Sequence, residues 1–411
     1  MSTKNIIYMD YQATTPCDKR VLESMLPYFC DDFGNPHSNH VMGSRAHEAV
    51  EKARDQIAKL IKANNAREII FTSGATESNN LAICGVARFY GEKRKKIITD
   101  PIEHKCVLEA CRAMEREGFE IVMLPVSEKG LIDLNALEKA VDEQTVLVSV
   151  MTANNEIGVV QPIDEISGIC RRKNVPFHTD AAQAVGKTEV DASKVDLMSI
   201  SAHKIYGPKG IGALYVGLNP RIKLTPLFFG GGQERGMRSG TLAPALCAGF
   251  GKACEIAASE MESERARLTM LKDRFLKKIF AGLDRVYLNG DEKQGIPGCI
   301  NLSFFGVEGE GIMLGIPDIC ISSGSACTSE SLEPSYVLKA IGARDEVIHS
   351  SLRIGLGRFT TAEEVDRAAS KIITAVKRLR AMSPVWKEED CEIFGKSNES
   401  LSGSEKYRRT G

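Results

Sequence analysis

Neither sign of charge dominates this sequence, and no long apolar run interrupts it. Its 53 Lys and Arg residues are balanced by 54 Asp and Glu residues, which leaves a formal net charge of -1. A chain without a basic excess is poorly suited to bind nucleic acid or an acidic membrane surface. No apolar run approaches the roughly 20 residues that span a bilayer. We therefore expect neither a nucleic-acid partner nor a membrane.

Metal-binding and export signals are also missing. The 12 cysteines include no Cys-x-x-Cys pair and no zinc-ligand spacing, which argues against a thiol-based metal site. Residues 1–9 resemble neither a signal peptide nor an Arg-rich transit peptide. We expect reduced thiols in a reducing compartment, the bacterial cytoplasm first and a mitochondrion or related organelle as the alternative. Cysteines in helical apolar patterns, such as Cys84 and Cys247, are expected to be inert.

Strand-like and helix-like segments alternate over most of the chain. Short apolar runs predict strands at 68–72, 96–99, 120–126, 145–151, 175–179, 195–200 and 212–216. Apolar residues at helical spacing and intervening segments predict helices at 41–62, 77–90, 105–117, 134–141, 163–173 and 246–283. This alternation is typical of an α/β fold with a mostly parallel sheet and helices on both faces. Ligands of such sheets bind beyond the carboxyl ends of the strands.

The length of 411 residues predicts two domains. We expect a large domain at 16–260 and a smaller α+β domain formed by 1–15 and 261–386. The remaining segment, 387–411, has few apolar residues and many Ser, Glu, Lys and Gly, and is expected to be a disordered tail.

A lysine and a carboxylate follow two of the predicted strands. Lys204 lies directly after the 195–200 strand and before Gly207 and Pro208, which end regular structure. Most lysines are solvated surface charges, but one at a buried strand end can become a nucleophilic amine. Asp180 follows the 175–179 strand, with Gln183 one turn further on. A carboxylate in such a place is costly unless it is paired with a cation or a protonated ring nitrogen.

A small turn after the 68–72 strand opens a helix with the residues Ser73-Gly74-Ala75-Thr76. Helix capping by Ser73 or Thr76 is the simpler interpretation of this motif by itself. The alternative is a phosphate site built from free N–H groups and the helix dipole. A lysine, a carboxylate and a phosphate cradle together match the needs of pyridoxal 5'-phosphate. A nicotinamide cofactor does not fit, because no Gly-x-Gly-x-x-Gly follows the first strand.

Two further residues are candidates on position alone. His104 follows the 96–99 strand, so it either stacks on or titrates against a cofactor, or is a structural or surface group. Cys327 lies in the small polar segment 322–329, SSGSACTS. It is either a nucleophile that has to travel or an incidental exposed thiol.

Eight stretches make the sequence resemble the cysteine desulfurases of iron–sulfur cluster assembly, the IscS/NifS type of the class V aminotransferase-like enzymes. They are 8–16 (YMDYQATTP), 71–80 (FTSGATESNN), 154–160 (NNEIGVV), 178–186 (HTDAAQAVG), 201–210 (SAHKIYGPKG), 230–241 (GGGQERGMRSGT), 322–335 (SSGSACTSESLEPS) and 349–361 (HSSLRIGLGRFTT). The resemblance covers about 5–386. It implies the pyridoxal-phosphate-dependent fold type I. Position 202 departs from it, with Ala in place of Gly, which suits only a backbone without positive φ.

The resemblance also implies a role for each matching residue. Lys204 would hold the cofactor as a Schiff base, Asp180 would pair with its ring nitrogen, and His104 would stack on the ring. The other implied cofactor-binding residues are Gln183 at the ring hydroxyl, Ala75, Thr76, Ser201 and His203 at the phosphate, and Asn155 near the cofactor. Thr241 would reach the phosphate of the other subunit, which implies a homodimer.

The implied reaction removes sulfur from L-cysteine. Asn155 and Arg353 would bind the substrate carboxylate, and Cys327 would accept the sulfur as a persulfide, leaving L-alanine. The sulfur would pass to an iron–sulfur scaffold protein or be used in transfer RNA thiolation, and the Cys327 persulfide would be a shared cluster ligand. The alternatives are a selenocysteine lyase, another class V pyridoxal-phosphate enzyme, or a non-catalytic partner subunit. The last predicts loss of Lys204, Asp180 or Cys327, and all three are present.

Overall fold

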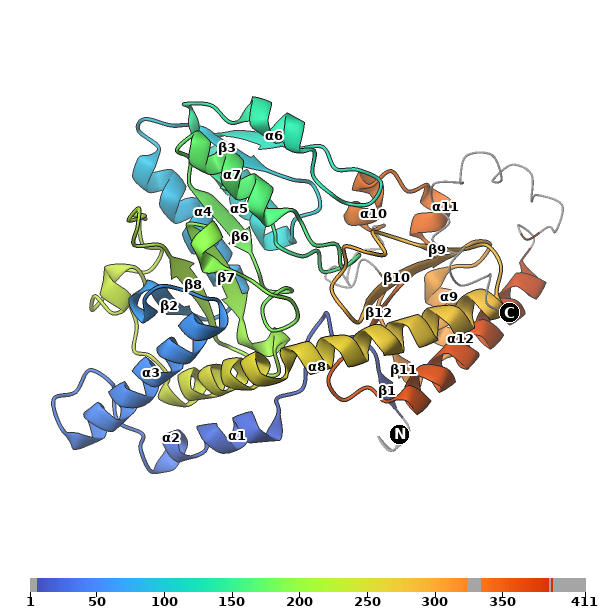
Figure 1. Ribbon diagram of the computed structural model, residues 1–411, viewed down its shortest axis with the longest axis horizontal. Coiled ribbons are helices and arrows are strands. Elements are labelled where there is room, and N and C mark those ends of the chain that lie inside the picture. Colours follow the sequence, from blue (N-terminus) through green and yellow to red (C-terminus); the bar gives the residue numbers. More distant parts are fainter. Residues whose placement is uncertain (1–5, 324–333, 384–385, 387–411) are drawn as a thin grey trace.

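A seven-stranded sheet forms the centre of the computed structural model, which describes residues 6–323, 334–383 and 386 (Figure 1). Its strand order is β2-β8-β7-β6-β5-β3-β4. The strands are β2 (Ile69–Thr72), β3 (Lys96–Thr99), β4 (Glu120–Met123), β5 (Thr145–Ser149), β6 (Phe177–Asp180), β7 (Leu197–Ser201) and β8 (Gly212–Val216). Within this sheet only β8 runs antiparallel to its neighbours. The expected mostly parallel sheet is therefore confirmed.

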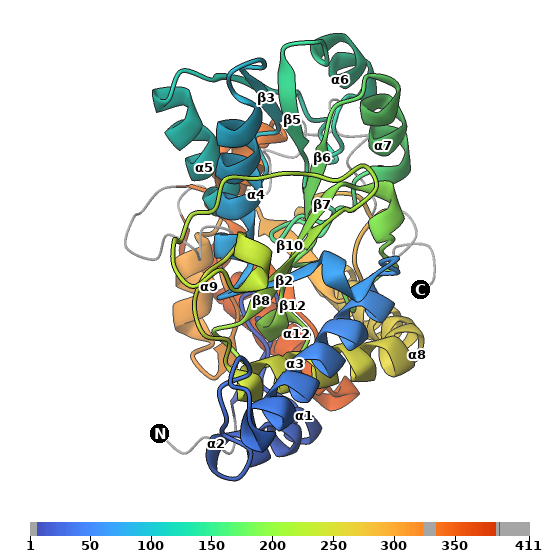
Figure 2. The same ribbon diagram turned by 90° about the vertical axis from the view of Figure 1, so that its left-hand side faces the viewer.

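Helices cover both faces of this sheet, as the alternation predicts (Figure 2). Because successive side chains of a strand point to opposite faces, Ile97 packs with α4 and α5 while Ile98 packs with the cluster of α3, α7 and α8. These helices are α3 (Val41–Leu60), α4 (Ala75–Tyr90), α5 (Lys105–Arg116), α6 (Leu134–Ala140), α7 (Ile163–Arg172) and α8 (Pro244–Gly282). The short helices α1 (Lys19–Met25) and α2 (Pro27–Cys30) pack against α8.

A second hydrophobic cluster surrounds a smaller antiparallel sheet of order β12-β10-β9. Its strands are β9 (Val286–Leu288), β10 (Cys299–Phe304) and β12 (Ser351–Gly355), and a separate parallel pair joins β1 (Ile7–Tyr8) to β11 (Ile319–Cys320). The helices of this part are α9 (Gly309–Gly315), α10 (Tyr336–Ala340), α11 (Asp345–Ile348) and α12 (Ala362–Met382). The N-terminal strand thus lies beside residues more than 300 positions later in the chain.

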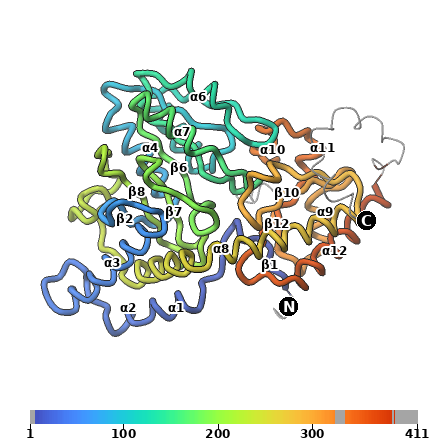
Figure 3. The backbone as a smooth tube through the Cα atoms, viewed as in Figure 1, coloured from blue at the N-terminus to red at the C-terminus, as the bar shows by residue number. Residues whose placement is uncertain are grey.

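One long helix, α8, runs through both parts (Figure 3). Its 39 residues correspond to about 58 Å at the usual rise. Its first half packs on α3 and α1, and its second half packs on α12. The domain boundaries expected at 16, 260 and 386 stay predictions, and the tail 387–411 lies outside the described residues. None of the described helices is apolar enough over a sufficient length to cross a membrane.

The predicted elements are present, with differences of a few residues at their ends. The largest is at the strand expected over 120–126, which ends at Met123. Pro125 explains this end, because a proline has no N–H to donate to a neighbouring strand. The predicted inert cysteines are buried, and burial raises the pKa of Cys84 and raises that of Cys247 to about 12.

Candidate active site

A cavity of about 530 Å³ opens at the carboxyl edge of the large sheet. Its walls come from the segments that follow β2, β3, β5, β6 and β7, together with residues 12–14 and β12. The predicted residues that line it are Ala75, Thr76, His104, Asn155, Asp180, Gln183, Ser201, His203, Lys204 and Arg353. Ten candidates chosen from sequence therefore meet at one place, where parallel sheets bind ligands.

Lys204 is the last residue of a 3₁₀ turn, η4 (Ala202–Lys204), that begins directly after β7. Its Nζ donates hydrogen bonds to the backbone oxygens of Gln12 and Ala13, the latter at 2.8 Å. These two carbonyls hold the amine at the cavity wall. Ala202, the position that departs from the resemblance, has no positive φ, so its Cβ brings no backbone strain.

Asp180 ends β6 and is 6% exposed. Its Oδ2 accepts a hydrogen bond from Asn79 Nδ2 at 2.7 Å, and its Oδ1 accepts one from the Ala182 backbone N–H at 2.9 Å. The carboxylate is thus oriented by two neutral donors. Sequence reasoning missed Asn79, which lies on the sheet-facing side of α4 and is completely buried.

His104 is the N-cap residue of α5, and its Nδ1 accepts a hydrogen bond from the Cys106 backbone N–H at 3.2 Å. Burial lowers the pKa of His104, with the positive charges of Lys204 and Lys105 adding to the effect against Asp180. The ring is therefore neutral near pH 7, with its proton on Nε2, since Nδ1 is an acceptor. Burial also raises the pKa of Cys106 to about 12, which keeps this thiol protonated.

The first turn of α4 differs from the simpler sequence interpretation. Its N-cap residue is Gly74, and no side chain caps it, so capping by Ser73 or Thr76 was wrong. Gly74 has φ +156°, which side chains rarely adopt, and the backbone N–H of Ser73 is bound by Glu77 at 2.7 Å. The uncapped helix start faces the cavity, and its dipole favours an anion there.

Two polar residues at the carboxyl end of β7 line the same cavity as this helix start. Ser201 is 2% exposed, and His203 Nδ1 lies 3.0 Å from the Thr14 hydroxyl. Burial, together with the positive charge of Lys204, lowers the pKa of His203 to about 4. His203 is consequently neutral near pH 7 and can act as a hydrogen-bonding group.

Arg353, on β12, closes the cavity from the smaller sheet. It is 2% exposed and forms an ion pair with Asp10, with Nη2 at 2.8 Å from Oδ1. Its Nη1 donates to the Asn155 backbone oxygen at 3.2 Å. Its Nε and Asn155 Oδ1 are buried without a hydrogen-bond partner, as is Gln12 Oε1. The free guanidinium N–H is suited to a carboxylate, whereas the two amide oxygens are suited to a hydrogen-bond donor of a ligand.

Two candidates are not part of this lining. Thr241 is exposed and lies away from the described cavity wall. Cys327 lies outside the described residues, so its roles as nucleophile and cluster ligand stay predictions. In the described part of the chain, no group of three or more His, Cys, Asp or Glu side chains could hold a metal ion.

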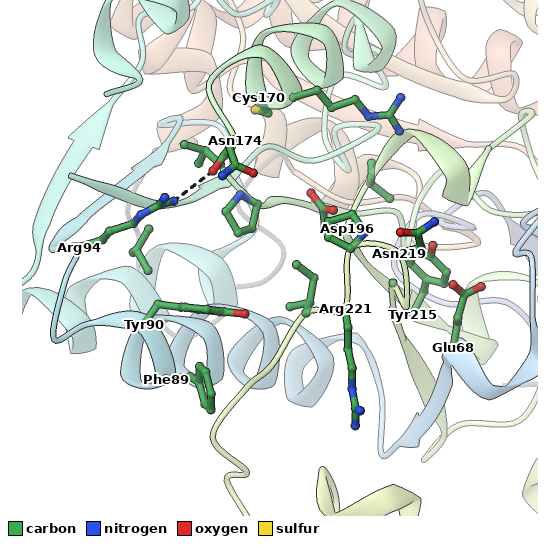
Figure 4. Close-up of a pocket in the computed structure, with 18 of the residues that line it drawn as sticks. Glu68, Phe89, Tyr90, Arg94, Cys170, Asn174, Asp196, Tyr215, Asn219 and Arg221 are labelled. Atoms are coloured by element: carbon green, nitrogen blue, oxygen red, sulfur yellow. Dashed lines mark hydrogen bonds between the residues drawn. The ribbon is translucent and has the colours of Figure 1, made fainter. Parts of the chain in front are cut away.

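A larger cavity, about 780 Å³, opens at the opposite, amino edge of the same sheet. Figure 4 shows Tyr90 and Asp196 at this cavity and the hydrogen bond from Arg94 to Asn174. It contains none of the residues that the sequence singled out. Several of its charged groups bind backbone atoms: Arg94 donates to the Asn174 and Thr145 oxygens, and Asp196 accepts from the Phe177 N–H.

Comparison with known proteins shows similarity over most of the chain. Residues 7–368 match the family model described as aminotransferase class V. The cysteine desulfurase IscS of Rickettsia rickettsii (strain Iowa) is 59% identical over 383 residues, 92% of this chain and 93% of that protein. A cysteine desulfurase of Homo sapiens is 58% identical over 383 residues, 92% of this chain and 84% of that protein.

Two solved structures have a fold similar to that of this chain. A NifS-like protein has a TM-score of 0.85 at 36% identity, covering 91% of this chain and 100% of its own. A structure described as SspA in complex with cysteine has a TM-score of 0.76 at 37% identity, covering 86% of this chain and 100% of its own.

Proposed function

The chain belongs to the class V aminotransferase family, and we propose that it is a cysteine desulfurase that binds pyridoxal phosphate in the carboxyl-edge cavity. The single observation that carries this proposal is the meeting of Lys204, Asp180 and Arg353 at one cavity, in a chain 58–59% identical to cysteine desulfurases. Such a site offers an amine nucleophile, an acceptor for a ring nitrogen and an anchor for a carboxylate.

The residues present fit the cofactor. Lys204 would supply the amine that holds the cofactor, Asp180 would accept a hydrogen bond from its protonated ring nitrogen, and His104 would offer a neutral ring to stack on. The uncapped start of α4 at Ala75 and Thr76, with Ser201 and His203, suits a phosphate. When bound, pyridoxal phosphate supplies an electron sink for the substrate carbon that loses a proton.

The substrate-side roles fall to Arg353, Asn155, Lys204 and Cys327. Arg353 and Asn155 would bind the carboxylate of L-cysteine, to which the buried, unpartnered Arg353 Nε–H and the side-chain NH2 group of Asn155 can donate. The Lys204 amine would take and return the proton of the substrate Cα. The Cys327 thiolate attacks the substrate sulfur.

The atoms and electrons of this reaction balance. The C–S bond of L-cysteine breaks, an S–S bond forms at Cys327, and protons return to the carbon skeleton, so L-cysteine and one thiol give L-alanine and one persulfide. No external oxidant or reductant is needed. The thiol must be reachable as a thiolate, since the thiolate is the nucleophile.

We also propose an oligomeric state, a sulfur acceptor and a cellular compartment. We expect a homodimer in which the exposed Thr241 of one subunit reaches the phosphate of the other. The persulfide sulfur is expected to pass to an iron–sulfur scaffold protein. The bacterial cytoplasm is the expected compartment, with a mitochondrion or related organelle as the alternative.

A single-turnover assay tests the function. The purified protein is mixed with L-cysteine, and alanine and protein-bound persulfide are quantified for the wild type, Cys327→Ala and Cys320→Ala. Cys320 is a matched control, because it lies on β11 shortly before the same segment. Equal amounts of alanine and persulfide in wild type and Cys320→Ala, both lost in Cys327→Ala while the cofactor stays bound, are expected. Bound cofactor with neither product in the wild type would overturn the desulfurase assignment.

A further inference from the structure

A second lysine, Lys187, points toward the carboxyl-edge cavity from behind its wall. Its Nζ donates a hydrogen bond to Gln183 Oε1 at 2.9 Å. Gln183 is 5% exposed and lines the cavity, whereas Lys187 does not. Lys187 lies one helical turn after Gln183, in the short turn that follows β6, so backbone geometry holds the two side chains together.

The contact decides which end of the Gln183 amide faces the cavity. The Lys187 amine is the donor in this hydrogen bond, so the amide oxygen is the end of the Gln183 side chain that faces Lys187. The amide nitrogen then points the other way, and Gln183 Nε2 donates to the Gln12 backbone oxygen at 2.9 Å. The same carbonyl also accepts from Lys204 Nζ.

This arrangement leaves one N–H of the Gln183 side-chain amide available. A carbonyl oxygen has two lone pairs, and those of Gln12 are taken by Gln183 and Lys204. The Gln183 NH2 group has two hydrogens, of which one is engaged. Its second N–H is therefore the part of this side chain that can bind an oxygen atom of a ligand in the cavity.

The acceptor for the Lys187 amine is an amide oxygen and not a carboxylate. The pKa of Lys187 is lowered to about 7, mainly by burial and also by the positive charges of Lys204 and Arg353, against the opposite effect of Cys299 and Glu264. No carboxylate among the described residues forms a salt bridge with Lys187. Gln183 Oε1 is thus the hydrogen-bond acceptor that the structure gives to this amine.

We propose that Lys187 is a positioning residue that fixes the side-chain amide of Gln183 with its NH2 group toward the cofactor oxygen it binds. This inference rests on the proposed function, since it assumes pyridoxal phosphate in the cavity. Lys187 acts through Gln183 and touches neither cofactor nor substrate. Its removal leaves Gln183 Oε1 buried without a donor, and the amide is then free to rotate.

Cofactor affinity is the property that tests this proposal. Apoprotein is titrated with pyridoxal phosphate, and the bound fraction is followed by absorbance. Lys187→Met keeps the length of the side chain but removes the donor, and we expect the dissociation constant to rise about tenfold, the effect of one hydrogen bond to a charged group. Lys187→Arg retains donors and is expected to recover most of the affinity. Lys173→Met, at an exposed lysine just after α7, is the control.

Two variants at Gln183 separate positioning from a structural effect. In a Gln183→Ala background, Lys187→Met should cause no further loss, because the lysine acts only through the amide. Gln183→Glu keeps the contact with Lys187 but has no N–H, so it should bind the cofactor as weakly as Gln183→Ala. Thermal unfolding of each apoprotein shows whether the variant folds.

Each outcome bears on one proposal or the other. Wild-type protein that does not bind pyridoxal phosphate would overturn the proposed function. Wild-type affinity in Lys187→Met, additive losses in the double variant, or full affinity in Gln183→Glu would overturn the role of Lys187 alone. If Lys187→Met does not fold, Lys187→Leu, which also lacks a donor, takes its place in the same titration and in the double variant.

Discussion

Two cavities open at opposite edges of the seven-stranded sheet, and the larger one is at the amino edge. It measures about 780 Å³, against about 530 Å³ at the carboxyl edge. Both contain arginine, lysine and carboxylate side chains. Size and residue types therefore do not separate them.

The hydrogen-bond partners do separate them. At the amino edge, several charged groups bind the backbone: Arg171 donates to the Ser193 oxygen, and Glu68 accepts from the Leu218 N–H. No buried side-chain nitrogen or oxygen in the described lining of that cavity lacks a partner. At the carboxyl edge, Gln12 Oε1, Asn155 Oδ1 and Arg353 Nε are buried without partners. Since buried polar groups are nearly always matched, these atoms mark the cavity that is built for a ligand.

The same substitution at the two edges should give the largest difference. Lys204→Arg keeps a positive charge, but a guanidinium stays protonated and cannot form a Schiff base. We expect alanine formation from L-cysteine to fall by about 10³-fold or more, since covalent and proton-transfer roles are lost together. The measurement is steady-state alanine production, with bound cofactor followed by absorbance.

Lys93→Arg is the matched control, because Lys93 is an exposed lysine that lines the amino-edge cavity. It should retain wild-type turnover. Loss of activity in Lys93→Arg, or its retention in Lys204→Arg, would contradict the assignment of chemistry to the carboxyl edge.

The parts of the site that could be predicted are those that depend on strand ends. Lys204, Asp180 and His104 each follow an apolar run, and parallel topology brings such positions to one edge. The mostly parallel sheet and its cover of helices on both faces follow from the same alternation, whereas the strand order does not. These features need only local patterns and a general rule of topology, which is why the sequence sufficed.

The parts that could not be predicted depend on contacts between distant segments. Asn79 orients Asp180 across 101 positions, and the carbonyl of Gln12 holds Lys204 across 192. A backbone oxygen has no signature in a sequence, and an asparagine inside a helix does not reveal its partner. The start of α4 was misassigned for a related reason, because two good capping residues flank Gly74, yet neither caps the helix.

A buried histidine on β6, between the two cavities, should make the free energy of unfolding depend on pH. His178 is fully buried, with Nδ1 at 2.8 Å from the Ser149 hydroxyl and Nε2 at 3.0 Å from the Ser199 hydroxyl. Burial lowers its pKa from 6.5 to about 3. Between these values the unfolded chain binds a proton that the folded chain does not, so stability falls as pH falls from about 6.5 toward 3. The slope from this residue is about 1.4 kcal/mol per pH unit.

Urea unfolding at several pH values measures this slope. His178→Asn should be less stable than the wild type at pH 8 but lose less stability on acidification. His37→Asn, at an exposed histidine, supplies the comparison for a residue outside the core. An unchanged slope in His178→Asn would show that other groups govern the acid sensitivity.

The smallest effect on turnover is expected at the amino edge itself. Arg94→Met removes the hydrogen bonds to the Asn174 and Thr145 backbone oxygens, at 3.1 and 3.4 Å. We expect the free energy of unfolding to fall by about 1–2 kcal/mol, as for one or two such bonds. kcat and KM for L-cysteine should stay within about twofold of the wild type, because the loss lies at the opposite edge of the sheet from Lys204. A fall of kcat by about tenfold with an unchanged free energy of unfolding would mean that the amino-edge cavity itself binds a group that turnover requires. The presence or absence of hydrogen-bond partners for buried polar atoms would then no longer distinguish the two cavities.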